Sequence, residues 1–150
     1  MKKNILLSII VNTFNCENYL KQCLESIKKQ LSIESELIVI DDSSTDNTFK
    51  IIESELCDLS NCSYYSIEHS GISNSRNFGI SKAKGTYFMF VDGDDYIIEN
   101  SLNKIIEYLK SSEFDLTLFN TIKYFDSKNY FEIEKFSLQD GQCLSEQDLI

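Results

Sequence analysis

Three carboxylates lie close together in the segment 92–95, which reads Asp-Gly-Asp-Asp. These side chains repel one another at neutral pH, and a divalent cation that prefers oxygen ligands, Mn2+ or Mg2+, would relieve the repulsion. The segment follows the apolar run 86–91, which predicts a buried strand and a firmly held backbone. Gly93 would let the chain turn or let a ligand approach closely. A solvated acidic turn is the alternative interpretation, but the position after an apolar strand favours a metal site.

A second acidic pair, Asp41 and Asp42, follows the predicted strand 36–40. Its carboxylates could accept hydrogen bonds from the N–H of a base or from a ribose hydroxyl. The alternative is a cap on the next helix, where the helix dipole favours negative charge, and one Asp can cap while the other binds. Phe14, just past the predicted strand 6–11, could stack on a base or could simply belong to the packing.

Two side chains are the only ones of their type in the chain. Arg76, the only arginine, lies in the polar start of a predicted helix. Its guanidinium could hold a diphosphate through two parallel hydrogen bonds, and a surface ion pair is the alternative. His69, the only histidine, is interpreted as a structural or solvent-facing residue rather than a direct participant in chemistry.

Strands and helices alternate along the chain. Apolar patterns predict strands at 6–11, 36–40, 64–67 and 86–91, helices at 18–30, 71–83 and 101–109, and another helix with Phe49, Ile52 and Leu56 on one face. Weaker strands are expected at 116–119 and 130–136. The alternation indicates an α/β fold, a doubly wound and mostly parallel sheet with helices on both faces. Because ligands bind beyond the carboxyl ends of such strands, the polar clusters should converge on one site.

Length, composition and net charge limit the classes of protein to which this chain can belong. The chain has 150 residues, 42% of them hydrophobic, which is enough for the core of one compact domain. The formal net charge of -10 disfavours nucleic acid as a partner, although a cation can bridge an acidic protein and an anionic nucleotide.

Nothing in the sequence predicts export or membrane insertion. The apolar run near the N-terminus is short and is interrupted by Ser8, so it reads as a strand rather than as a signal peptide. No apolar stretch reaches the length of a membrane helix. The five cysteines are odd in number and lack zinc spacing, which is typical of thiols in a reducing cytosol. We expect a cytoplasmic protein.

Four segments together resemble the family 2 glycosyltransferases, which have the Rossmann-like GT-A fold. They are residues 8–20, 36–48, 71–79 and 84–95, and they occur in the family order. Each motif is weak by itself. In combination they identify residues 6 to 110 as similar to the part of the family that binds the nucleotide sugar. The resemblance implies sugar transfer from a nucleotide diphosphate donor, a UDP-sugar, usually with inversion at the anomeric carbon.

The resemblance also implies a role for each matching residue. Thr13 and Phe14 would line the base pocket, and Asp42, helped by Asp41, would read the base. Arg76 would approach the diphosphate, and Asp92 would contact the ribose. Asp94 would bind Mn2+ or Mg2+, and Asp95 is near enough to share or exchange the roles of Asp92 and Asp94. Two departures from the family pattern concern turn stiffness more than chemistry. Asn12 and Glu99 stand where the family usually has proline.

The stretch after the acidic segment is short for this family, whose catalytic carboxylate lies further along the chain. Glu132, Glu134 and Asp140 follow, but none of them stands in a recognisable family motif. We therefore expect residues 1–125 to form a donor-binding domain and residues 126–150 to begin a truncated acceptor-side region. The general base would then be absent from this chain. The acceptor would be a glycan or a lipid-linked molecule, with peripheral membrane association through a missing C-terminal part.

Three alternatives remain at this stage. The chain could be a nucleotide-binding module without catalysis. A phospho-acceptor signalling domain usually carries its acid pair after the first strand, where this chain has Asn12 and Thr13. A nucleotidyltransferase would need a basic, glycine-rich loop near its start, and none is present.

Overall fold

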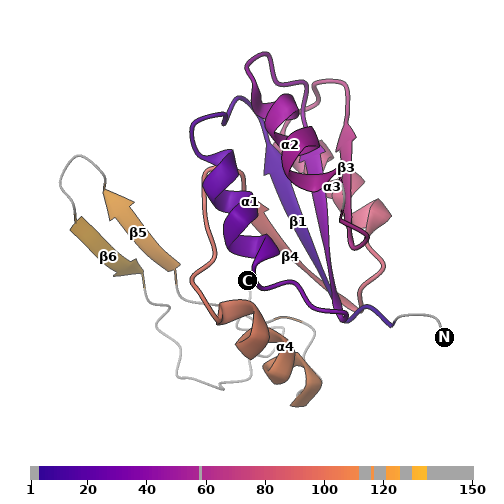
Figure 1. The fold of residues 1–150 in the computed structure, drawn as a ribbon, viewed down its shortest axis with the longest axis vertical. Helices are drawn as coiled ribbons and strands as arrows, with labels where there is room; N and C mark the ends of the chain where they lie inside the picture. The colour runs from indigo at the N-terminus through magenta and orange to yellow at the C-terminus, as the bar shows by residue number, and fades with distance from the viewer. Residues whose placement is uncertain (1–3, 58, 112–115, 117–120, 126–129, 135–150) are drawn as a thin grey trace, which may run out of the picture. The chain divides into compact units, whose positions relative to one another are not determined.

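A computed structural model describes residues 4–57, 59–111, 116, 121–125 and 130–134. The chain forms two units, Met1–Ser112 and Glu113–Ile150 (Figure 1), and each is described by itself. None of the helices in the described residues is long and apolar enough to cross a membrane.

The first unit alternates strands and helices, as the sequence predicts. Its elements are β1 (Leu7–Thr13), α1 (Leu20–Lys28), β2 (Ser35–Asp41), α2 (Thr48–Leu56), β3 (Cys62–Ser66), α3 (Ile72–Lys82), β4 (Tyr87–Asp92) and α4 (Ser101–Ser111). The strands form one sheet in the order β3-β2-β1-β4, and every pairing is parallel (Figure 1). The predicted α/β class is therefore confirmed, and the carboxyl ends of the strands share one edge.

Helices cover both faces of the sheet because β1 and β2 are apolar on both sides. Leu7, Ile9 and Val11 pack in one cluster with the apolar faces of α1, α2 and α4. On the other face, Ile10 lies in a second cluster with Phe78 of α3. Helix α3 comes very close to the sheet, since a Cβ on Gly79 would stand 2.4 Å from Cγ2 of Ile10. The start of α3 is thereby held near the carboxyl end of β1.

A buried polar network fixes the other end of the sheet. The Ser8 hydroxyl and the Lys84 backbone N–H each donate to Oε1 of Glu36, both at 2.7 Å. The Gly85 backbone N–H donates to the Ser8 hydroxyl oxygen at 2.9 Å. This network joins β1, β2 and the start of β4, and it supports the register that places Asp92 opposite Asn12.

Outside the first unit, β5 (Thr121–Phe125) and β6 (Tyr130–Glu134) form an antiparallel pair. The second of these agrees with the strand expected at 130–136, while β5 was not predicted. Of the strand expected at 116–119, only Leu116 is described and it is not in a strand. The unit boundary after residue 112 precedes the functional boundary expected at 125, and the functional assignment of both segments stays a prediction.

Candidate functional site

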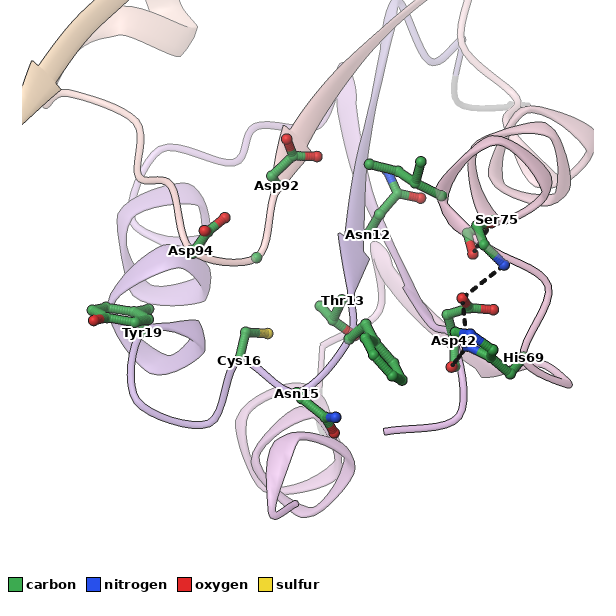
Figure 2. A pocket seen from close by; sticks show the side chains of 14 residues that line it. Asn12, Thr13, Asn15, Cys16, Tyr19, Asp42, His69, Ser75, Asp92 and Asp94 are labelled. Carbon is green, nitrogen blue, oxygen red and sulfur yellow. Dashed lines mark hydrogen bonds and ion pairs between the residues drawn. The ribbon is translucent and has the colours of Figure 1, made fainter. Parts of the chain in front are cut away.

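A pocket of about 400 Å³ opens at the carboxyl ends of β1 and β4, beside the start of α3 (Figure 2). Its lining includes five of the predicted site residues: Thr13, Phe14, Asp42, Asp92 and Asp94. The lining also includes Gly93, where the sequence predicts a turn or the close approach of a ligand. The other lining residues were not predicted to belong to the site: Asn12, Asn15, Cys16, Tyr19, His69, Gly71, Ile72 and Ser75. Asp41, Arg76 and Asp95 lie outside this lining set. The polar clusters after the strands therefore converge on one site.

The acidic segment is bound tightly to the end of β1. The Gly93 backbone N–H donates to the Asn12 carbonyl oxygen at 2.9 Å. A Cβ on Gly93 would lie 2.8 Å from Sγ of Cys16 and 3.0 Å from Cγ2 of Thr13. Only glycine permits this close approach, because any side chain would push the acidic turn away from β1.

Arg76 neutralises the first acid of the segment. Its Nη2 donates to Oδ1 of Asp92 at 2.9 Å, and its guanidinium carbon lies 5.2 Å from the centre of the Phe90 ring. The buried Nε atom of Arg76 has no hydrogen-bond partner within the part of the chain that the structure describes. The predicted diphosphate-binding arginine therefore stands beside the pocket with its charge directed to Asp92.

The other two acids, Asp94 and Asp95, are exposed. Partial desolvation of the Asp95 carboxyl group raises its pKa above its ordinary value, and the neighbouring charges of Asp94 and Asp92 raise it further. Among the described residues, no group of three or more metal-binding side chains could enclose an ion. Asp94 and Asp95 are the side chains of this segment that could hold a cation, whose remaining positions phosphate or water oxygens would fill.

Asp42 is a buried anchor for the loop that leads into α3. Its carboxylate accepts the backbone N–H of Ser70 at 2.8 Å and that of Gly71 at 2.9 Å, and its Oδ2 lies 3.0 Å from Nδ1 of His69. Burial acts to raise the pKa of Asp42, but the two backbone N–H groups and His69 outweigh it and hold that pKa below its ordinary value. Asp42 is therefore a carboxylate at neutral pH.

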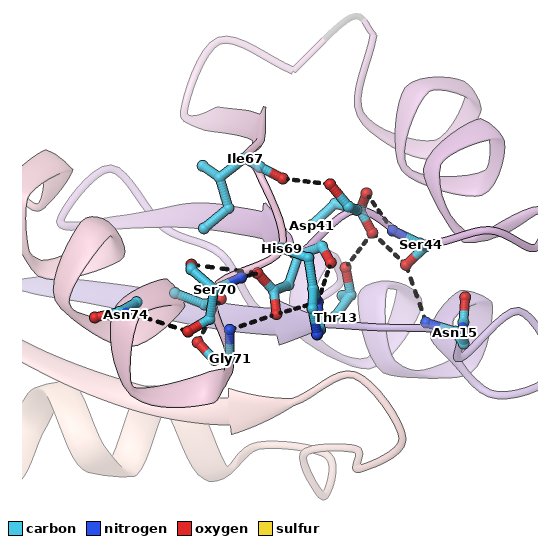
Figure 3. A network of polar contacts seen from close by, with 12 residues as sticks. Thr13, Asn15, Asp41, Ser44, Ile67, His69, Ser70, Gly71 and Asn74 are labelled. Atoms are coloured by element: carbon cyan, nitrogen blue, oxygen red, sulfur yellow. Dashed lines mark hydrogen bonds and ion pairs between the residues drawn. The ribbon is translucent and has the colours of Figure 1, made fainter.

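Asp41 has a different environment, although it is equally buried (Figure 3). It accepts the Thr13 hydroxyl at 3.2 Å and the Ser44 backbone N–H at 3.2 Å, and the Ser44 hydroxyl also donates to it. Ser44 in turn accepts the backbone N–H of Asn15 at 3.0 Å. Asp41 thus ties the loop after β2 to the loop after β1, behind the pocket.

Phe14 and His69 form an aromatic pair at the pocket. Phe14 is 50% exposed, and its ring centre lies 4.8 Å from that of His69, with the rings tilted by 33°. A half-exposed phenyl ring is available to stack on a planar ligand. The sequence analysis interpreted His69 as a structural or solvent-facing residue and did not anticipate this contact. The sequence did offer a signal, because His69 lies shortly before the segment 71–79, one of the four family motifs.

Comparison with known proteins agrees with the geometry. The sequence model described as glycosyl transferase family 2 matches residues 8–144. Glycosyltransferase GlyG of Streptococcus pneumoniae is 32% identical over 127 residues, which is 84% of this chain and 42% of the relative. Glycosyltransferase GlyA of the same organism is 34% identical over 130 residues, 83% of this chain and 18% of the relative. The chain thus spans less than half the length of these relatives.

Solved structures give the same result. Residues 1–349 of Staphylococcus aureus TarS superpose with a TM-score of 0.66 at 34% identity, over 71% of this chain and 33% of that one. A mannosyltransferase of Pyrobaculum calidifontis, at 20% identity and a TM-score of 0.63 over 72% of this chain and 33% of that one, shares the fold. The chain belongs to glycosyl transferase family 2.

Proposed function

We propose that this chain binds a UDP-sugar together with a divalent cation, as the donor-binding part of an inverting glycosyltransferase. The observation that carries the proposal is the convergence of Phe14, Asp42, Asp92 and Asp94 around one pocket. TarS, a relative named as a poly(ribitol-phosphate) β-N-acetylglucosaminyltransferase, has been solved with UDP and with UDP-GlcNAc, which supports uridine as the nucleoside.

The groups around the pocket suggest how the nucleotide would lie. Phe14 would stack on the base above Thr13, while Asp42 would hold the loop at Ser70 and Gly71 against the base. Asp92 would contact the ribose. Arg76, which pairs with Asp92, would turn to the diphosphate when the donor arrives. Asp41 would act indirectly, by fixing the loop after β1 that carries Phe14.

Asp94, helped by Asp95, would hold Mn2+ or Mg2+ at the diphosphate. The exposed position of both carboxylates and the mutual repulsion of the cluster favour such an ion. The chemistry that a bound cation supplies is stabilisation of the negative charge on the departing nucleotide diphosphate. Gly93 would keep the two carboxylates close to the end of β1, so that the diphosphate meets them without displacing the loop.

The acceptor would be a glycan or a lipid-linked molecule, in polysaccharide or glycoconjugate synthesis on the cytoplasmic side of the membrane. The relative TarS is named as a poly(ribitol-phosphate) β-N-acetylglucosaminyltransferase, which supports a polymeric acceptor for the present chain. We assign no general base among the described residues. Binding of the donor and transfer of the sugar are therefore separate questions for experiment.

Titration calorimetry tests the donor proposal directly. UDP is injected into the 150-residue chain with Mn2+ and, in a second series, with a chelator. We expect binding that depends on Mn2+, because the ion would bridge the diphosphate and the acidic segment. A chain that binds no nucleotide under either condition would refute the proposal. Transfer from UDP-sugars to a panel of acceptors is measured in parallel, and we expect little or no turnover.

Stacking on Phe14 gives a second measurable expectation. Replacing Phe14 by alanine should lower the affinity for UDP about tenfold, since stacking of a base on an aromatic ring contributes about 1–3 kcal/mol. The melting temperature should change little, because the ring is 50% exposed. The matched control is Phe88→Ala, which removes a ring 47% exposed outside the pocket lining. Equal losses of UDP affinity in both variants would rule out stacking at Phe14.

A further inference from the structure

The loop that carries Phe14 is fixed along its backbone by side chains of a second loop. Residues 14–19, the β1 loop, follow β1, and residues 42–48, the β2 loop, follow β2 and reach the first residue of α2. The backbone N–H groups of residues 15, 16 and 17 donate to the β2 loop at 3.0, 2.9 and 3.1 Å. The acceptors are the Ser44 and Thr48 hydroxyls and the Asp46 carboxylate, and Figure 3 shows the contact at Ser44. Three consecutive backbone groups bound in this way leave the β1 loop little freedom.

Two side chains of the β1 loop bind the β2 loop in the opposite direction. Oδ1 of Asn15 accepts the backbone N–H of Thr45 at 2.8 Å. Oε2 of Glu17 accepts both the backbone N–H and the side-chain amide of Asn47, each at 2.8 Å. Asn15 has a φ of 50°, in the left-handed region that asparagine adopts more readily than most residues. The two loops therefore hold each other through their own side chains.

Glu17 differs from Asn15 in that it does not line the candidate pocket. Among the residues that the structure describes, its carboxylate forms no ion pair, and Asn47 is its hydrogen-bond partner. Asn15 lines the pocket and could touch a ligand directly. An effect of Glu17 on ligand binding, in contrast, must pass through the loop that it holds.

The Phe14 ring depends on the β1 loop for its orientation. The ring is 50% exposed, and its aromatic contact in the described part of the chain is His69, with ring centres 4.8 Å apart. A side chain that packs so little keeps rotamer freedom unless its backbone is fixed. Ordering a loop or a side chain when a ligand binds lowers the affinity, and a loop that is already held avoids this cost.

We propose that Glu17 is a positioning residue for the donor: by binding Asn47 it locks the β1 loop onto the β2 loop and presents the Phe14 ring for stacking on the base. The inference rests on the proposed function, since the orientation of Phe14 matters for binding only if a base stacks on it. Glu17 thereby joins the two parts of the base pocket, because the β2 loop that it binds begins with Asp42.

The first test compares Glu17→Ala, which removes the acceptor, with Glu17→Gln, which keeps an acceptor oxygen in the same place. Calorimetry with UDP and Mn2+ measures the affinity. Glu17→Ala should bind UDP about two- to tenfold more weakly, because the loop and the ring must then be ordered on binding. Glu17→Gln should stay within about twofold of the parent, because an amide oxygen can accept the same two hydrogen bonds. An equal loss in the two variants would show that the bonds to Asn47 are not what supports binding.

A double-mutant cycle with Phe14→Ala separates positioning from a merely structural role. If Glu17 acts through the Phe14 ring, Glu17→Ala should lower UDP affinity in the parent chain but not in a chain that already carries Phe14→Ala. Equal losses in the two backgrounds would contradict the proposal. Amide hydrogen exchange gives a second measurement: the Asn47 N–H should exchange faster in Glu17→Ala, and UDP with Mn2+ should slow it again by ordering the loop.

The matched control is Glu55→Ala, which also removes a glutamate that joins the segments of α1 and α2. The Glu55 carboxylate binds Lys28 of α1, and neither residue lines the candidate pocket. This variant should lower the melting temperature without lowering UDP affinity. If Glu55→Ala weakened UDP binding as much as Glu17→Ala, a general loss of stability would explain both results.

The outcomes separate this inference from the proposed function. If the parent chain binds UDP and Glu17→Ala binds it equally well, the role of Glu17 is wrong while the donor proposal stands. If Glu17→Ala does not fold, Asn47→Ala replaces it in the test, since it removes the side-chain bond to Glu17 and leaves the backbone bond. Asn47→Ala should then weaken UDP binding, and an unchanged affinity would overturn the inference. If the parent chain binds no nucleotide, the proposed function and this inference fail together.

Discussion

Replacing Asp94 by alanine is expected to abolish the Mn2+-dependent part of UDP binding. Asp94 is the exposed acid of the segment that lines the pocket, and its neighbour Asp92 is already paired with Arg76. In the proposed function Asp94 supplies the principal protein oxygen of the ion, so we expect affinity for UDP in the presence of Mn2+ to fall at least about 100-fold, or about 2.8 kcal/mol. Calorimetry with and without Mn2+ measures the difference.

The comparison variants for Asp94 are chosen by charge and position. Asp95→Ala should weaken metal-dependent binding less, because Asp95 lies outside the pocket lining. Glu99→Ala removes an exposed acid from the same chain segment and should leave the Mn2+ effect intact. Melting temperatures of all three should stay close to the parent, as is usual for exposed positions. An Asp94→Ala chain whose UDP affinity still rises with Mn2+ as in the parent would remove Asp94 from the metal site.

The second large effect concerns stability rather than affinity. Asp42→Ala should lower the free energy of unfolding by about 2–4 kcal/mol, because it leaves the backbone N–H groups of Ser70 and Gly71 without their buried acceptor. Urea denaturation at neutral pH measures the loss. Asp95→Ala, which removes an exposed carboxylate, should change the same quantity by no more than about 0.5 kcal/mol. Comparable losses in the two variants would contradict the anchoring role.

The same contact has a defined pH dependence. The folded-state pKa of Asp42 lies below its ordinary value, so its stabilising contribution is complete above the unfolded-state pKa of about 3.9. The contribution is lost as the pH falls through the lower folded-state pKa. The unfolding free energies of the parent and of Asp42→Ala should therefore converge below about pH 4. A difference that stays constant from neutral pH down to pH 3 would show that the Asp42 charge does not hold the loop.

The sequence predicted the framework of this molecule well, for physical reasons. The apolar runs 6–11 and 36–40 correspond to the fully buried strands β1 and β2. A parallel sheet buried on both faces demands such continuous runs. Because parallel strands end at one edge, the convergence of their polar ends on one pocket followed from the pattern alone.

The details of the site depended on contacts that a one-dimensional pattern does not contain. The sequence alone does not show which of Asp41 and Asp42 faces the pocket. The answer depends on the face of the sheet to which each side chain points and on the loop that covers that face. The partners of Asp42 come from residues 69–71, after a different strand. Glu17 has no role in the sequence prediction, and its bonds to Asn47 became visible only in three dimensions.

The anchor at Asp42 also has an evolutionary consequence. Asp42 holds the start of α3 mainly through backbone N–H groups at 2.8 and 2.9 Å, while the Ser70 hydroxyl stands further away at 3.4 Å. Gly71, with a φ of 84°, must stay a residue that tolerates the left-handed region. Position 70 carries no such restriction. Its side chain can therefore change among descendants of this chain without loosening the start of α3.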